Sequence, residues 1–142
     1  MSPMIESRRW AIYWGPVIAY AGLIFFLSSR SHPHEDLPSL LDLFSDKVLH
    51  AIEYAGLGGL CYRAFRYGAA GPLAARAMLW AVVAASIYGV TDEVHQLFVP
   101  LRDSSWQDWL ADTIGAAVGA AAAGKWFGYR ENRRPALAAA PE

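Results

Sequence analysis

Three segments of the sequence carry chemically active side chains at a spacing of four residues. The three sets are Asp46, His50 and Tyr54; Asp92 and Gln96; and Asp108 and Asp112. Residues four apart lie on one face of an α-helix, so each set predicts a helix with a polar stripe. Histidine titrates near neutral pH, and a carboxylate near it can accept or donate a proton. Asp46, His50 and Glu93 are therefore the candidates for general acid–base catalysis.

A partly overlapping set of side chains could bind a charged ligand. The candidates are Lys47, Tyr54, Asp92, Gln96, Arg102, Asp108 and Asp112. Lys47 and Arg102 are suited to hold a phosphate or carboxylate, and the acids and the amide can hydrogen-bond a headgroup. The alternative is that these groups only hold the helices together, and Arg102 could equally pair with Asp108 or Asp112. Tyr54 could likewise serve only in packing.

The sequence gives no support for other kinds of site. Its histidines are His32, His34, His50 and His95. Their spacing matches no standard zinc motif, so we expect no bound metal. No nucleotide fingerprint, phosphate loop or nucleophilic triad is present, so we expect no cofactor, and whether the protein is an enzyme stays open. The arginines within residues 130–134 favour contact with lipid headgroups over nucleic acid.

Four apolar segments can position these side chains. They cover residues 10–27, 48–65, 77–90 and 106–127. A helix of about 20 residues crosses the hydrocarbon layer of a bilayer, and the chain is 55% hydrophobic and only 18% charged. The sequence therefore predicts an all-α, polytopic membrane protein with four transmembrane helices. A signal peptide is the alternative for the first segment, although no small-x-small cleavage site follows it.

The basic residues divide between alternate sides of these segments. If the N-terminus is cytoplasmic, only Arg30, Lys47 and Arg102 lie on the outer side. This distribution follows the positive-inside rule and predicts that both termini are cytoplasmic. The three polar stripes then meet near the outer surface. Asp112 would lie within the bilayer and needs a partner there, for which His50 and the three outer basic residues are the candidates.

Glycines indicate where the helices pack closely. Gly115 and Gly119 form a small-residue face on the fourth segment, and glycines at 56, 58 and 59 can do the same on the second. We expect a single four-helix domain over residues 1–130. Residues 131–142, which are small and contain proline, are expected to form a disordered cytoplasmic tail.

Two stretches of the chain resemble the VanZ-like family of small bacterial membrane proteins. They are "DKVLHAIEYAGLG" and "YGVTDEVHQLFVPLRDSSWQDWLADTIGAAVG". The resemblance rests on D-K-x-x-H-x-x-x-Y in one segment, then D-E-x-x-Q, a loop arginine and D-x-x-x-D-x-x-G. This chain has Leu101 where the family usually has glycine before the loop arginine. The resemblance implies a multi-pass protein of the bacterial cytoplasmic membrane.

The family's namesake is associated with low-level resistance to the glycopeptide teicoplanin. Taken with the polar stripes and the outer basic residues, this association leads to the hypothesis that an outer-facing polar pocket binds a lipid headgroup or cell-envelope precursor and affects glycopeptide susceptibility. Two alternatives stay open: a membrane-embedded acid–base enzyme acting on a lipid-linked substrate, and a purely structural membrane subunit. Transport is less favoured, because four short spans enclose only a small pore. The lipid bilayer is the expected partner, and the sequence does not determine an oligomeric state.

Overall fold

The structure, a computed structural model, describes residues 3–30, 46–102 and 104–138. Its elements are α1 (Pro3–Ser28), α2 (Asp46–Arg63), the short π-helix η2 (Ala64–Gly68), α3 (Gly71–Ala75), α4 (Ala77–Gln96) and α5 (Trp106–Ala138). The four predicted apolar segments fall within α1, within α2 with η2, within α4 and within α5. The predicted all-α class is thus confirmed for the part of the chain that the structure describes.

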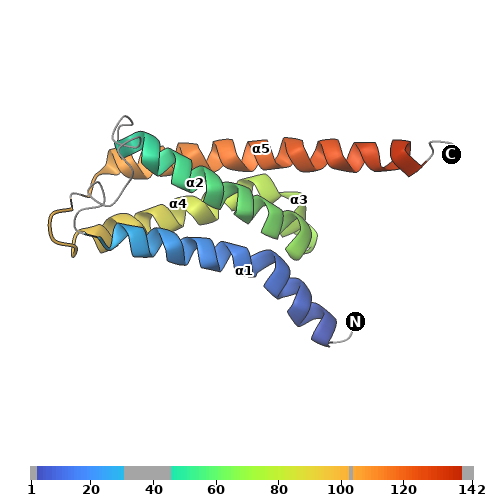
Figure 1. The fold of residues 1–142 in the computed structure, drawn as a ribbon, viewed down its shortest axis with the longest axis horizontal. Coiled ribbons are helices and arrows are strands. Elements are labelled where there is room, and N and C mark those ends of the chain that lie inside the picture. The colour runs from blue at the N-terminus through green and yellow to red at the C-terminus, as the bar shows by residue number, and fades with distance from the viewer. Residues whose placement is uncertain (1–2, 31–45, 103, 139–142) are drawn as a thin grey trace.

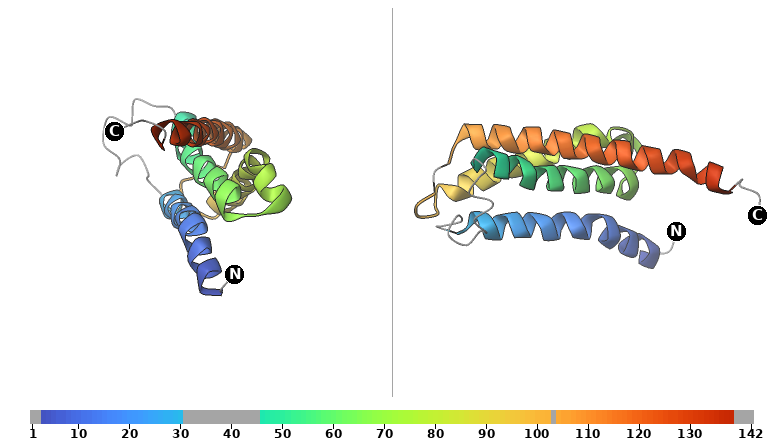
Figure 2. Two further views of the ribbon diagram at one scale, coloured as in Figure 1. Left: turned by 90° about the vertical axis from the view of Figure 1, so that its right-hand side faces the viewer. Right: turned by 45° about the horizontal axis from the view of Figure 1, so that its top comes forward.

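The four long helices run side by side along the molecule (Figure 1). Both ends of the chain lie at one end of the bundle, and the connection between α4 and α5 lies at the other (Figures 1 and 2). We call this second end, formed by the end of α1, the start of α2, the end of α4 and the start of α5, the polar end. Within the described residues, the stretches Glu6–Ser28 and Ala77–Gln96 are long and apolar enough to cross a membrane.

α2 and α5 contact each other through their backbones. A Cβ added at Gly115 would meet the carbonyl oxygen of Ala51, and one added at Gly119 would meet that of Ala55. Gly58 in α2 lies against the α5 backbone in the same way. Helices can approach this closely only where side chains are missing, so the small-residue face predicted from the sequence is confirmed.

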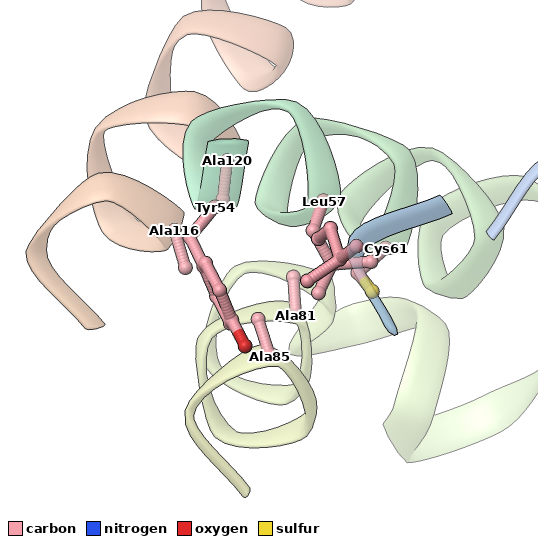
Figure 3. Packing of buried hydrophobic residues seen from close by; sticks show 8 residues of the cluster. Tyr54, Leu57, Cys61, Ala81, Ala85, Ala116 and Ala120 are labelled. Atoms are coloured by element: carbon pink, nitrogen blue, oxygen red, sulfur yellow. The ribbon is translucent and has the colours of Figure 1, made fainter. Parts of the chain in front are cut away.

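Small side chains also fill the core beside this contact. The buried cluster contains Tyr54, Leu57 and Cys61 from α2, Ala81 and Ala85 from α4, Ala116 and Ala120 from α5, and Ile24 from α1 (Figure 3). Alanines four residues apart leave a flat strip along α4 and another along α5. The single large ring of Tyr54 lies between these strips, and this residue is fully buried. Close packing of this kind holds membrane helices together, because in lipid the hydrophobic effect does not drive helices to associate.

α1 contains Pro16 and bends in its N-terminal half (Figure 1). Proline has no N–H, so the carbonyl of Ile12 loses its donor within the helix. Arg63 Nη1 donates a hydrogen bond to that carbonyl at 3.2 Å. The guanidinium of Arg63 also lies over the ring of Tyr13, 4.9 Å from its centroid. The carbonyl that lacks a helical donor because of Pro16 is thus hydrogen-bonded by a side chain from the end of α2. This contact fixes α1 against that helix.

Helix α5 extends beyond the domain boundary expected at residue 130. α5 continues as helix to Ala138, past the boundary expected at residue 130, and residues 139–142 lie outside the described residues. Alanine favours helix strongly, which explains why a small-residue segment continues one. The Tyr67 hydroxyl also donates to Glu131 Oε1 at 2.8 Å and ties this part of α5 to η2.

Candidate functional site

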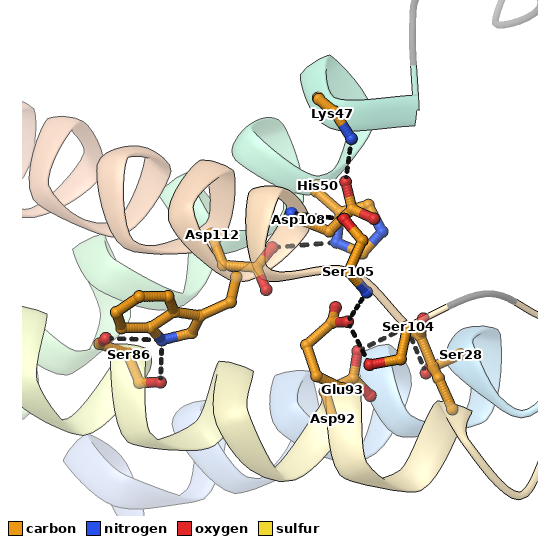
Figure 4. A network of polar contacts seen from close by, with 12 residues as sticks. Ser28, Lys47, His50, Ser86, Asp92, Glu93, Ser104, Ser105, Asp108 and Asp112 are labelled. Carbon is orange, nitrogen blue, oxygen red and sulfur yellow. Dashed lines mark hydrogen bonds and ion pairs between the residues drawn. The ribbon is translucent and has the colours of Figure 1, made fainter.

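The polar end brings together side chains from all four long helices (Figure 4). Its buried members are Ser28 from α1, His50 from α2, Asp92, Glu93 and Gln96 from α4, and Asp108 and Asp112 from α5. The sequence predicted that the stripes on α2, α4 and α5 meet at one end, and the geometry agrees. An enclosed network of charged groups at a bundle end is costly to bury unless its members pair with one another or with a ligand.

His50 and Asp112 form the most deeply buried ion pair of the network. His50 Nδ1 lies 3.0 Å from Asp112 Oδ1, and the Asp112 side chain is completely buried. Gly89 in α4 makes room for this carboxylate, because a Cβ there would lie only 3.1 Å from Asp112 Oδ2. Oδ2 itself is buried and has no hydrogen-bond partner among the described residues. The partner that Asp112 needs within the bundle is thus His50, one of the predicted candidates.

Lys47 and Asp108 form a second link between α2 and α5. Lys47 Nζ donates to Asp108 Oδ1 at 2.7 Å, with the lysine side chain half-exposed and the acid buried. Ser105 precedes α5 and its Oγ accepts a hydrogen bond from the Asp108 N–H at 3.2 Å, as an N-cap residue does. Lys47 therefore already neutralises one acid, so any anion at this site would compete with Asp108 for it.

Glu93 joins α4 to the connection that precedes α5. Its Oε2 accepts hydrogen bonds from the Ser105 N–H at 2.7 Å and from the Ser104 hydroxyl at 3.0 Å. Its Oε1 is buried and has no partner in the described part of the chain. Both serines were missed by the sequence analysis, although Ser105 carries the N-cap signal of a small hydroxyl residue before an apolar helix.

Asp92 and Gln96 join α4 to α1. Gln96 Nε2 donates to Asp92 Oδ2 and to Ser28 Oγ, each at 3.1 Å. Ser28 was also missed, because a serine at the end of an apolar span gives no distinctive signal. Asp92 Oδ1 is buried and unpaired among the described residues. These bonds position a carboxylate beside the network while leaving one of its oxygens unused.

Two further predicted binding residues lie in contrasting surroundings. Tyr54 is fully buried and its hydroxyl has no partner among the described residues, so it lies in the core with only its polar atom unused. Arg102 is partly exposed, and its Nε is buried without a partner in the described residues. Asp46 begins α2, but its side chain lies outside the described residues.

The turn before Arg102 places Leu101 in the left-handed region of backbone conformation, with φ of +64°. A non-glycine residue pays a steric cost there, whereas glycine does not. This is the position where the sequence analysis noted leucine in place of the usual glycine. The backbone therefore keeps the turn that glycine would favour, at the expense of local strain.

A cavity of about 270 Å³ adjoins the network on the side of Glu93. It is lined by Val90, Glu93, Val94, Leu97, Ser104, Ser105, Trp106 and Trp109. Most of these side chains are apolar, and the polar ones are Glu93 and the two serines that bind it. A mostly apolar lining with a polar edge suits an amphiphilic molecule.

The chain matches the family model of VanZ/LLP1 over residues 13–127. No curated protein and no solved structure matches the chain significantly. The matched range includes the described members of the polar end and the parts of the four long helices that carry them. Since it covers most of the sequence, this chain belongs to the VanZ/LLP1 family.

Proposed function

We propose that this VanZ/LLP1 protein binds a phosphate-bearing lipid headgroup or a lipid-linked cell-envelope precursor at its polar end, in the outer leaflet of the bacterial cytoplasmic membrane. Binding there would alter susceptibility to glycopeptides such as teicoplanin. The observation that carries this proposal is the cavity with apolar walls that ends at Glu93 and the buried network.

The membrane location is supported by the surface of the helices. Large apolar side chains are more than half exposed on all four long helices, with Phe26 on α1, Ile52 on α2, Ile87 on α4 and Val118 on α5 as examples. Water penalises such a surface and lipid does not. We propose four spans within one domain over residues 1–130. Both chain ends lie opposite the polar end, and most basic residues lie on the side of the termini, so we propose that both termini are cytoplasmic.

This topology can be tested with single cysteines in a Cys61→Ser background. Val99 lies on the connection at the polar end, and Ala70 lies between η2 and α3 at the opposite end. The two variants are Val99→Cys and Ala70→Cys. A membrane-impermeant maleimide applied to intact spheroplasts is expected to label position 99 and to label position 70 only after permeabilisation. The reverse labelling pattern would refute the orientation.

Arg102 is the side chain we assign to the phosphate. Guanidinium groups bind phosphate through charge-assisted hydrogen bonds, and the buried Nε of Arg102 has no partner among the described residues. Such a bond contributes about 1.5–3 kcal/mol, which corresponds to roughly 10- to 100-fold in affinity. We propose Lys47 as a second contact for the anion, in competition with Asp108, while Asp92, Gln96, Asp108 and Asp112 hold the surrounding framework.

The test compares Arg102→Ala with Arg102→Lys and with the control Arg76→Ala, which lies at the start of α4. Binding of phosphatidylglycerol is measured by native mass spectrometry, and teicoplanin susceptibility is measured in cells that express each variant. We expect Arg102→Ala to lose binding by at least about tenfold, Arg102→Lys to retain part of it, and the control to match the unchanged protein. Equal binding by all three variants would favour the alternative that these polar groups only hold the helices together.

A second candidate function is acid–base catalysis on a lipid-linked substrate. The buried pair of His50 and Asp112, with Glu93 beside it, supplies the groups for proton transfer. His50→Gln removes the titrating ring while keeping a polar side chain. An enzyme requires that this variant still binds lipid but no longer restores the envelope lipids of a deletion strain; unchanged envelope lipids in the deletion strain itself would exclude this function.

A further inference from the structure

Three potential metal ligands converge at the polar end. One ligand atom from each of His50, Glu93 and Asp112 can be chosen so that all three lie within 4.8 Å of one another. The residues come from α2, α4 and α5, and all three are more than nine-tenths buried. Sequence spacing could not reveal this set, because standard motifs place at least two ligands within one segment.

Two of the three residues direct an unused oxygen into the network. Asp112 Oδ2 and Glu93 Oε1 are buried and have no hydrogen-bond partner among the described residues. A buried carboxylate oxygen without a partner loses the free energy of its hydration without compensation. Two such oxygens in one cluster indicate that something other than the described side chains binds there.

The second oxygen of each carboxylate is already anchored. Glu93 Oε2 is held by Ser104 and Ser105, and Asp112 Oδ1 is held by His50. Ligands of protein-bound metals are typically oriented by hydrogen bonds from residues that do not bind the metal, as Ser104 and Ser105 do for Glu93. Each carboxylate therefore has one fixed oxygen and one oxygen that is positioned but unused.

We propose that His50, Glu93 and Asp112 bind one divalent transition-metal ion, Zn²⁺ or Mn²⁺. One imidazole nitrogen with two carboxylate oxygens suits these ions, because zinc favours nitrogen and manganese favours oxygen. Two ligands at about 2.1 Å from one ion lie at most about 4.2 Å apart. The three candidate ligand atoms lie within 4.8 Å of one another, so the side chains must move closer together when the ion binds, and His50 must exchange its contact with Asp112 for the ion.

The ion also offsets an excess of buried negative charge. Asp92, Glu93 and Asp112 are buried close together, whereas Lys47 already pairs with Asp108. A dication among these acids stabilises all of them in the charged form. Three protein ligands leave coordination positions for water or a ligand oxygen.

The test is a calorimetric titration of the full chain in detergent, without added lipid, after treatment with EDTA. ZnCl₂ and MnCl₂ are titrated in separate experiments into the unchanged protein, Glu93→Gln and Asp112→Asn. We expect one ion per chain for at least one of the two metals, with affinity reduced more than about tenfold in both variants. Glu93→Gln keeps the acceptor for Ser104 and Ser105, so it is expected to fold even if Asp112→Asn does not.

Two controls separate this site from other sources of metal binding. Glu131→Gln removes an acid at the opposite end of the bundle and is expected to bind metal as the unchanged protein does. The double variant His32→Ala with His34→Ala removes the two histidines that are closest in the sequence, and it is likewise expected to bind metal as the unchanged protein does. The proposal is overturned if neither metal binds at millimolar concentration, or if Glu93→Gln binds as tightly as the unchanged protein. Because no lipid is present, this result and that of the headgroup test are independent.

Discussion

At the scale of single residues, the polar end contains buried carboxylates with only one of their two oxygens hydrogen-bonded. Asp92, Glu93 and Asp112 each have one oxygen hydrogen-bonded and one oxygen unused among the described residues. Structural networks usually satisfy all their buried groups, because a partly satisfied network is less stable than an apolar core. The three unused oxygens therefore favour a ligand-binding role over a purely structural one.

Leu101 gives a prediction at this scale. Its side chain is 77% exposed, so removing it loses no core packing, while its φ of +64° is strained. The left-handed conformation costs about 1–2 kcal/mol for an L-residue, and glycine loses about 0.5–1 kcal/mol in backbone entropy. Leu101→Gly is expected to raise the free energy of unfolding by about 0.5–1 kcal/mol, measured by thermal melting in detergent. Leu101→Ala keeps the strain and is the matched control; an equal gain in both variants would contradict the reasoning.

At the scale of elements, α5 is the helix that organises the site. It supplies Asp108 and Asp112, packs on α2 through glycine, and is preceded by Ser105, which is hydrogen-bonded to Glu93. Its first turn and its small-residue face therefore determine how accurately the carboxylates are placed. Two predictions separate these contributions.

The N-cap of α5 is expected to contribute measurably to stability. Ser105→Ala removes the oxygen that accepts the Asp108 N–H, which typically costs about 1 kcal/mol. Ser105→Thr keeps the hydroxyl and should restore most of that loss. Denaturation of the two variants in detergent provides the measurement, and equal stabilities would show that the cap is unimportant.

The backbone contact between α2 and α5 is expected to tolerate no added side chain. Gly119→Ala places a methyl group against the carbonyl of Ala55, and overpacking of this kind costs about 1–3 kcal/mol or more. Gly22→Ala in α1 is the matched control, because nothing lies within 4 Å of the added Cβ and alanine favours helix. Thermal stability of the two variants should change in opposite directions; a fall of similar size in both would refute the packing argument.

At the scale of the whole molecule, the apolar surface and the buried charge invert the arrangement of a water-soluble protein. The prediction concerns Ile87, which lies near the middle of α4 and is 61% exposed. Ile87→Asp should reduce the amount of protein in the membrane fraction, because an acid at the centre of a span costs about 2.5–3.5 kcal/mol. Ile87→Leu is the control. In a soluble bundle the aspartate would face water and leave yield unchanged, so that outcome would count against the membrane location.

Much of the fold could be predicted because its signals are local. Apolar length gave the helices, the i,i+4 stripes gave the polar faces, and Gly115 with Gly119 gave the close contact. The pairing of Lys47 with Asp108 and of His50 with Asp112 was harder to predict. It depends on how far α2 and α5 slide along each other, and residue spacing within one helix does not determine that offset.

The remaining features lacked a distinctive sequence signal. Ser28 and Ser104 act through single hydrogen bonds that an ordinary serine can make anywhere. The continuation of α5 past residue 130 was obscured because a run of small residues with proline is typical of disordered tails. The convergence of His50, Glu93 and Asp112 is a property of three helices together and is visible only in three dimensions.

The glycine contact between α2 and α5 also has a genetic consequence. Every missense change of a glycine codon adds at least a Cβ, and at Gly58, Gly115 and Gly119 a Cβ would meet the backbone of the facing helix. Selection on a random-mutation library should therefore remove all amino-acid changes at these three positions. Exposed apolar positions such as Val118 should accept any apolar replacement. The positions that tolerate amino-acid substitution least are therefore expected to be these glycines, which have no side chain.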